Sequence, residues 1–398
     1  MASGVPDPDD SSLYEREANL PGFEDRHMMR EGRLGPSELF WRDHYSWLKD
    51  SGYLLRPRYS PRWSAPWMGT NKPSMNFEES VLPLSGIVMD ATRTSDGSYV
   101  VLKRVHRPRP SATSGAPREA QMFQKFATEP LASDPKNHCI RLTEHLQVPD
   151  NEDTDLIVMP LLFRWNQYPF LTIGEALDFL SQVFEGLQFM HNHNIWHGDC
   201  KVNNVMMDAS PLLKEDPHPW SANMTRDFRR RLSRVRNRTQ NPVKYYWIDF
   251  DLSDEHDPST GPALVDPCYG GIHHVPEFAF PDKKCDPFAV DIWCLGFMVQ
   301  AYFTEGYKSF GLTKKQGFEF LDGLVADMVQ EDPTKRPTID DVVRRFSDIK
   351  AGLSKWKLRS RCTDTPPSRS VFNLLRSTVF WTRQLYLVAR HIPPIPRH

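Results

Sequence analysis

The stretch Ile195-Trp196-His197-Gly198-Asp199-Cys200-Lys201-Val202-Asn203-Asn204-Val205-Met206-Met207-Asp208 decides the fold of this chain. Apolar pairs stand on both sides of Asp199, Lys201 and Asn204, so the pattern predicts a loop that short strands hold at both ends. Its polar side chains are expected to face a common cleft. Another carboxylate, Asp249, ends the aromatic run Tyr245-Tyr246-Trp247-Ile248, which is typical of a strand.

The two segments resemble the catalytic loop (His-Arg-Asp-x-Lys-x-x-Asn) and the metal-binding Asp-Phe-Gly of eukaryotic protein kinases. The resemblance covers roughly residues 76–350 and implies an α+β, bilobal protein kinase-like fold, with a small β-rich N-lobe and a larger helical C-lobe. It also implies an ion pair between Glu277 and Arg336. The other pieces that carry it stand in the family's order: Lys103 in the strand Tyr99–Val105, Glu119 in a helix over 117–127, an amphipathic helix over 172–191, Val275-Pro276-Glu277, Asp291-Ile292-Trp293 and Asp332–Thr338.

The resemblance assigns roles residue by residue. Lys103, held by Glu119, would bind the α- and β-phosphates of ATP, and Asn204 with Asp249 would hold Mg²⁺, or Mn²⁺ in its place. Asp199 would orient the substrate hydroxyl or accept its proton, with Lys201 near the transferred phosphate. The remaining nucleotide contacts are expected at Gly86, Val88, Val101, Met159 and Leu161.

Two of these assignments have plain structural alternatives. Lys103 in an apolar strand is also typical of a lysine that extends its amine to solvent at a sheet edge. Glu119 is equally typical of an acidic residue that favours the first turn of a helix.

Several positions depart from the kinase pattern. Val81 and Pro83 stand where the first two glycines of the phosphate-binding loop belong, and Pro lacks the backbone N–H that would bind phosphate. Gly198 replaces the catalytic-loop arginine, Asp251 replaces the glycine of Asp-Phe-Gly, and Gly270 takes the place expected for a substrate-loop threonine.

Three functions are therefore weighed. The first is an ATP- and Mg²⁺-dependent Ser/Thr protein kinase. The second is a pseudokinase scaffold, favoured by the altered glycine loop. The third is a small-molecule kinase similar to aminoglycoside and choline phosphotransferases, favoured by His197-Gly198-Asp199 and Ile248-Asp249-Phe250-Asp251. The helix around Asp291 and the Arg336 signature oppose this third reading.

The segments outside the core motifs are expected to be peripheral. Residues 1–75 form an N-terminal extension with a short docking helix around Leu39–Leu48, and the arginine- and aromatic-rich residues 56–63 lie on the surface. Within the kinase-like domain, the N-lobe spans 76–162 and the C-lobe 163–350. The arginine-rich insertion 209–244 is expected to be a solvated loop, with a nuclear signal or an anion-binding patch as alternatives. Residues 351–398 are a tail with a docking helix.

Composition sets the broad class. The chain has 398 residues, 39% of them hydrophobic, and a formal net charge of −2, which gives no general attraction to nucleic acid or an acidic membrane. It has no apolar run of about 18 residues that would span a bilayer. Its six cysteines form no Cys-x-x-Cys pair, which favours reduced thiols in an intracellular, cytoplasmic or nuclear protein. The expected partners are ATP and a protein substrate; the sequence leaves the oligomeric state open.

Overall fold

A computed structural model describes residues 23–106, 118–149, 151–233, 235–267, 270, 272, 274–364 and 371–398. The chain forms two compact units. Unit 1 comprises residues 1–128, 140–163 and 215–233, and unit 2 comprises residues 129–139, 164–214 and 234–398. The break after Phe163 lies next to the expected N-lobe/C-lobe boundary, whereas residues on both sides of the expected boundary at 75 belong to unit 1.

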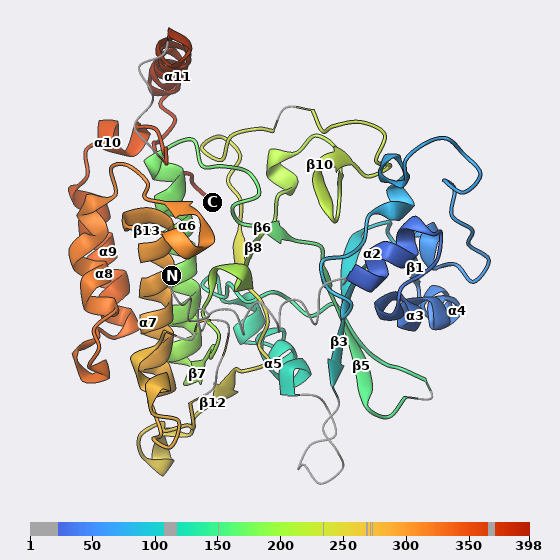
Figure 1. Ribbon diagram of the computed structural model, residues 1–398. Helices are drawn as coiled ribbons and strands as arrows, with labels where there is room; N and C mark the ends of the chain where they lie inside the picture. Colours follow the sequence, from blue (N-terminus) through green and yellow to red (C-terminus); the bar gives the residue numbers. More distant parts are fainter. Residues whose placement is uncertain are drawn as a thin grey trace, which may run out of the picture. The chain divides into compact units, whose positions relative to one another are not determined.

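Unit 1 is built on an antiparallel five-stranded sheet (Figure 1). Its order is β1 (Tyr53–Leu55), β2 (Val88–Arg93), β3 (Tyr99–His106), β5 (Thr154–Pro160) and β4 (Glu144–Gln147). Alternation along β2 and β3 sends Met89, Ala91, Val100 and Leu102 into the hydrophobic core on one face. Strands β2 and β3 form a hairpin, and Gly97 in its turn takes a left-handed φ of +74°, a conformation that glycine adopts without steric cost.

The N-terminal extension forms part of this sheet and its core. Helices α2 (Phe23–Arg30), α3 (Pro36–Asp43) and α4 (Tyr45–Asp50) precede β1, so the single helix expected around residues 39–48 is divided at His44. Trp41 of α3 and Leu48 of α4 are fully buried in the sheet's core cluster. The pairing of β1 with β2 makes residues 53–55 the edge strand of the sheet.

Two of the three arginines in the stretch after β1 are buried, which corrects the expectation that residues 56–63 form a surface arm. The Arg58 side chain is fully buried and pairs with Glu38 of α3, with 2.7 Å between Nη2 and Oε2. Arg56 is 6% exposed and pairs with Glu78 and Asp90. A buried guanidinium needs such partners because its charge is costly to remove from water.

Unit 2 is mainly helical. Its central helix α6 (Ile173–Asn192) confirms the helix predicted over 172–191, and Thr172 caps it by accepting a hydrogen bond from the Glu175 amide. The other helices are α7 (Pro287–Val299), α8 (Asp322–Met328), α9 (Ile339–Gly352), α10 (Lys355–Arg359) and α11 (Val371–Ala389), with a π-helical turn at Gln300–Thr304. The predicted Glu277–Arg336 pair is confirmed, with 2.6 Å between Nη1 and Oε1.

Short strands complete unit 2. Strand β7 (Ile195–Trp196) pairs with β12 (Asp254–Glu255), and β8 (Val205–Met207) pairs with β11 (Tyr245–Trp247). Strands β13 (Gly306–Tyr307) and β14 (Leu312–Thr313) also belong to unit 2, and β6 (Phe163–Arg164) includes the last residue of a unit 1 segment and the first of a unit 2 segment. Strands β7 and β8 flank the segment predicted to be the catalytic loop.

Part of the insertion is ordered, which corrects the expectation of a solvated loop. In unit 1, strand β9 (Pro217–His218) pairs with β10 (Ser221–Thr225) as a hairpin. In unit 2, Arg238 is 2% exposed and donates to the carbonyls of Trp165, Tyr168 and Pro169. Arg238 thus has a structural role inside unit 2, whereas Arg229, Arg230 and Arg231 of the insertion are exposed.

Among the helices that the structure describes, none combines the length and the apolar character needed to cross a bilayer. The described cysteines are free thiols, and Cys139, Cys200, Cys285 and Cys294 are buried.

Candidate active site

The predicted catalytic loop is a compact hydrogen-bonded cluster in unit 2. Asn204, at the end of the 3₁₀ turn Val202–Asn204, donates from Nδ2 to the Asp199 carboxylate Oδ2 at 2.8 Å and to the Asp199 carbonyl at 3.0 Å. Lys201 forms an ion pair with the same carboxylate. Asp199 is 8% exposed, so two neighbours fix its orientation where little water competes.

Pairing of β8 and β11 brings the two predicted metal ligands to the same end of these strands. Trp247 lies opposite Val205, and the Ile248 amide donates to the Asn204 carbonyl at 2.9 Å, so Asp249 follows directly. Asp249 has a left-handed φ of +68°, a conformation that non-glycine residues adopt at a cost of about 1–3 kcal/mol.

These residues fit a hard divalent cation. The amide hydrogens of Asn204 are directed at Asp199, which leaves the amide oxygen as its cation-binding atom. With the Asp249 carboxylate it supplies oxygen ligands, the type that Mg²⁺ and Mn²⁺ prefer. No group of three or more His, Cys, Asp or Glu side chains suited to a metal occurs among the described residues, so the phosphates and water would have to complete the coordination.

Asp291 of α7 holds the backbone of the predicted catalytic loop, a role that the sequence interpretation did not assign. Its fully buried carboxylate accepts from the amides of His197 at 2.7 Å and Gly198 at 2.9 Å, and from His191 Nε2 at 3.0 Å. An aspartate in the middle of an apolar helix was the available signal, because a buried carboxylate requires donors.

His197 joins the loop to the strand that carries Asp249. Its Nδ1 accepts from the Asp199 amide at 3.2 Å, so Nε2 carries the proton and donates to the Ile248 carbonyl at 3.2 Å. Burial lowers the pKa of His197 despite nearby carboxylates, Asp291 first among them. The His197 imidazole is therefore uncharged, and its hydrogen bonds hold the Asp199 backbone in position.

Two glycines in the site have steric reasons. Gly198 has φ of +78°, and a Cβ there would lie 2.4 Å from the Leu252 carbonyl oxygen, so the arginine of the family's motif does not fit this backbone. A Cβ on Gly270 would lie 2.4 Å from Asp199 Oδ1. Gly270 thus lies directly beside the Asp199 carboxylate.

Unit 1 contains the predicted phosphate-binding pair. Lys103 of β3 donates from Nζ to Oε1 of Glu119 at 2.7 Å, and Glu119, on α5 (Arg118–Phe126), is 4% exposed. This geometry bears out the ion pair in place of an amine extended to solvent. The amine lies on a strand and its partner on a helix, so both are held on regular elements.

Only some of the residues predicted to contact the base lie together on one face of the sheet. Val88 and Val101 lie on the Lys103 face of the sheet, and Met159 pairs with Val101. In contrast, the Gly86 carbonyl accepts from Trp41 Nε1 at 3.0 Å, and the Leu161 amide donates to the Tyr99 carbonyl at 3.1 Å. The Gly86 carbonyl and the Leu161 amide thus each have a partner within unit 1, and the nucleotide contacts at these two residues stay predictions.

A glycine-rich hairpin is also absent from the described part of the chain at this point. On the side away from β3, β2 pairs with β1, and residues 56–87 connect these two strands. Val81 and Pro83 therefore lie in a long connection and not in a short phosphate-binding turn. This long-range pairing could not be read from local sequence.

Comparison with known proteins identifies the family. A sequence model of the protein kinase domain matches residues 84–346, about two thirds of the chain, so this chain belongs to the protein kinase domain family. Three Ser/Thr protein kinases are among its similar proteins. The chain is 23% identical over 223 residues to prpf4B of Dictyostelium discoideum, 28% over 137 residues to pim-2 of Danio rerio and 26% over 135 residues to GRIK2 of Arabidopsis thaliana.

These matches cover part of each protein. They include 54%, 31% and 30% of this chain, and 23%, 44% and 31% of the relatives, in the same order. The chain thus aligns with less than half of each relative's length. The family membership supports a kinase-like phosphotransferase that uses ATP and a divalent metal, in agreement with the site described above.

Proposed function

We propose that the protein transfers the γ-phosphate of ATP to serine or threonine hydroxyls of protein substrates, with Mg²⁺ as the metal. The observation that carries this proposal is the Asp199–Lys201–Asn204 cluster. In this cluster the Asn204 amide and the Lys201 ammonium hold the Asp199 carboxylate in a fixed position. Phosphoryl transfer depends on alignment and charge neutralisation more than on covalent chemistry, and these residues supply both.

Each residue then has a stated task. Asn204 and Asp249 hold the metal, which neutralises phosphate charge when it is bound. Asp199 orients the substrate hydroxyl and accepts its proton, while Lys201 keeps that carboxylate in place and offsets negative charge nearby. Lys103, steadied by Glu119, binds the non-transferred phosphates.

The test is transfer of labelled γ-phosphate from Mg-ATP to a generic protein substrate. Replacing Asp199 by asparagine is expected to lower the rate by about 10²–10⁴-fold, because the base is removed while the amide keeps its shape. Asp348→Asn is the matched control, since Asp348 is an exposed aspartate of α9. Equal rates for wild type and Asp199→Asn would refute the proposal.

A second candidate is a pseudokinase scaffold that keeps the fold without efficient catalysis. The replacement of a glycine-rich hairpin by residues 56–87 favours it. Metal-dependent ATP binding that is lost in Asp249→Ala, without any transfer, would support this scaffold. We also propose an intracellular location, which is consistent with the free thiols of the described cysteines.

A further inference from the structure

The β2–β3 register places a carboxylate on the sheet face that carries the predicted nucleotide contacts. Asp90 lies directly opposite Val101, and Val88 lies opposite Lys103. Alternation along β2 therefore puts Asp90 on the same face as Val88 and Lys103, since the intervening Met89 points into the core. A carboxylate on this face would repel phosphate and leave an unfavourable charge beside a bound base unless something covered it.

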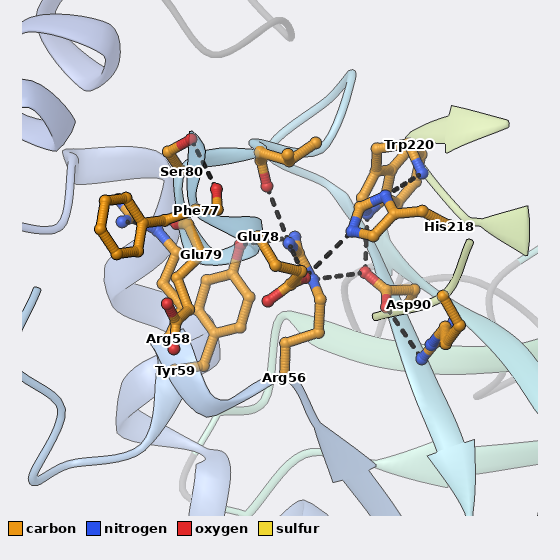
Figure 2. A network of polar contacts seen from close by, with 12 residues as sticks. Arg56, Arg58, Tyr59, Phe77, Glu78, Glu79, Ser80, Asp90, His218 and Trp220 are labelled. Atoms are coloured by element: carbon orange, nitrogen blue, oxygen red, sulfur yellow. Dashed lines mark hydrogen bonds and ion pairs between the residues drawn. The ribbon is translucent and has the colours of Figure 1, made fainter. Parts of the chain in front are cut away.

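The insertion hairpin covers this carboxylate. Trp220, in the β9–β10 turn, donates from Nε1 to Asp90 Oδ1 at 2.6 Å, and Arg226 approaches Oδ2 at 3.4 Å. Arg56 donates from Nε to Oδ1 at 3.0 Å, and Asp90 has no exposed surface. Figure 2 shows Trp220 and Arg56 converging on Asp90 from two different segments of unit 1.

A contact on the neighbouring strand extends the covered area. The Arg226 guanidinium carbon lies 3.9 Å from the ring centroid of Tyr99. Tyr99 is two residues before Val101 on β3, so its ring is on the same sheet face. The hairpin therefore spans β2 and β3 on the side where Val101 is expected to meet the base.

A third contact fixes the hairpin at its other strand. His218 is fully buried, and its Nε2 bonds to Glu78 Oε1 at 3.0 Å, while Nδ1 accepts from the Trp220 amide (Figure 2). Burial by itself raises the pKa of Glu78, but the hydrogen bond with His218 and the charge of Arg56 bring it down to about 2. Glu78 thus stays ionised, and the hairpin is held at both Asp90 and Glu78.

We propose that this hairpin is a built-in cap that competes with the nucleotide base for the β2–β3 face. The inference rests on the proposed function and adds its regulation. A base that reached the sheet at Asp90 would have to replace Trp220, because Asp90 has no accessible surface while the hairpin is docked. Arg56, which comes from the N-terminal extension, remains to neutralise Asp90 after the cap leaves.

The chain connectivity fits such a device. The hairpin segment 215–233 belongs to unit 1, but residues 164–214 and 234–398 on either side of it belong to unit 2. The cap is thus joined covalently to unit 2 at both ends, next to the segment that carries Asn204 and the one that carries Asp249. The hairpin can therefore leave the sheet of unit 1 while both of its ends stay joined to unit 2.

The test measures binding of a fluorescent ATP analogue, with Mg²⁺, to the full chain. Trp220→Phe removes the N–H donor and keeps the aromatic ring, and Arg226→Ala removes the second contact. Each variant loses a bond to a buried charge and frees a larger binding-competent fraction, so Kd should fall about tenfold or more. The matched control is Arg229→Ala, because the Arg229 side chain is 85% exposed and pairs only with exposed Asp227 among the described residues; its Kd should equal that of wild type.

Hydrogen exchange gives an independent readout on the wild-type chain. Saturating Mg-ATP should speed exchange of the amides of residues 221–225, because the nucleotide displaces the hairpin. Slower exchange, or a higher Kd in Trp220→Phe, would mean that the hairpin is a wall of the nucleotide site, and would overturn the cap. An unchanged Kd in both Trp220→Phe and Arg226→Ala would overturn it as well.

The Asp249→Ala variant separates this proposal from the proposed function. If the wild type binds the analogue, Asp249→Ala does not, and Kd is no lower in the Trp220 and Arg226 variants, only the cap is refuted. Binding that appears solely in those two variants supports the cap. Absence of binding in every variant overturns both proposals.

Discussion

Replacing Asp291 by asparagine is the sharpest test of how the catalytic loop is held. The carboxylate is fully buried and accepts three hydrogen bonds, two of them from the backbone amides of His197 and Gly198. Asparagine has the same shape but only one acceptor oxygen, so its NH₂ group must face at least one of these donors. The loop that carries Asp199 should therefore lose its anchor.

The magnitude follows from the bonds. Leaving one buried N–H unsatisfied costs about 1–3 kcal/mol, and the remaining bonds lose the benefit of a charged acceptor. We expect a total loss of about 3 kcal/mol in the free energy of unfolding, which lowers Tm by roughly 6–12 °C for a domain of this size. The rate of phosphate transfer should also fall, because Asp199 follows directly after the His197 and Gly198 amides that lose their acceptor.

The assay combines urea unfolding with steady-state phosphotransfer. If Asp291 positions the loop, kcat measured at temperatures below the melting transition should be lower in the variant than in the wild type. KM for ATP should stay near the wild-type value, since no ATP contact is assigned to Asp291. Asp348→Asn, an exposed aspartate in the same unit, is the control and should leave both quantities unchanged. A loss of stability below about 0.5 kcal/mol, together with full activity, would refute the reasoning.

Two other variants test steric and electrostatic features of the fold. Gly198→Ala should lower the free energy of unfolding by about 2–4 kcal/mol, because it combines a left-handed φ with a clash at the Leu252 carbonyl; urea unfolding near the wild-type midpoint would contradict this. Arg58→Met should cost about 3–5 kcal/mol because it strands the buried Glu38 carboxylate, whereas adding Glu38→Leu should restore most of the loss. Equal stability of the single and double variants would show that the pair is uncoupled.

The catalytic half-site could be predicted because its information is local. Asp199, Lys201 and Asn204 lie within six positions, and the flanking strands β7 and β8 are short and apolar. The apolar run that ends at Asp249 identified β11 in the same way. The pairing of Lys103 with Glu119 was implied by the resemblance to kinases, whereas periodicity by itself indicated only the strand and the helix.

The base-facing side could not be predicted, because it depends on distant parts of the chain. Strand β1 reaches β2 across residues 56–87, and Trp220 reaches Asp90 across 130 positions in the sequence. Their arginine-rich composition suggested a surface position for residues 56–63 and a solvated loop for the insertion 209–244, whereas ion pairs with buried carboxylates hold Arg56, Arg58 and Arg226 in place. Asp90 itself gave a signal, since a carboxylate amid apolar strand residues needs buried donors.

The departures of this chain from the kinase pattern form two groups. Gly198, Asp251 and Gly270 lie in or beside the predicted catalytic and metal-binding segments, whereas a second group concerns how a nucleotide reaches the sheet of unit 1. The groups that we propose for phosphate and metal are present: Lys103 is paired inside unit 1, and Asp199 with Asn204 inside unit 2. The changed elements, the 56–87 connection and the β9–β10 hairpin, concern the approach of the nucleotide to the sheet. Because the groups that act on the reacting phosphate are separate from those that admit the base, a change in one need not alter the other. We therefore expect this protein to differ from other kinases in its affinity for ATP, with nucleotide admission and not phosphate transfer as the step that its insertion controls.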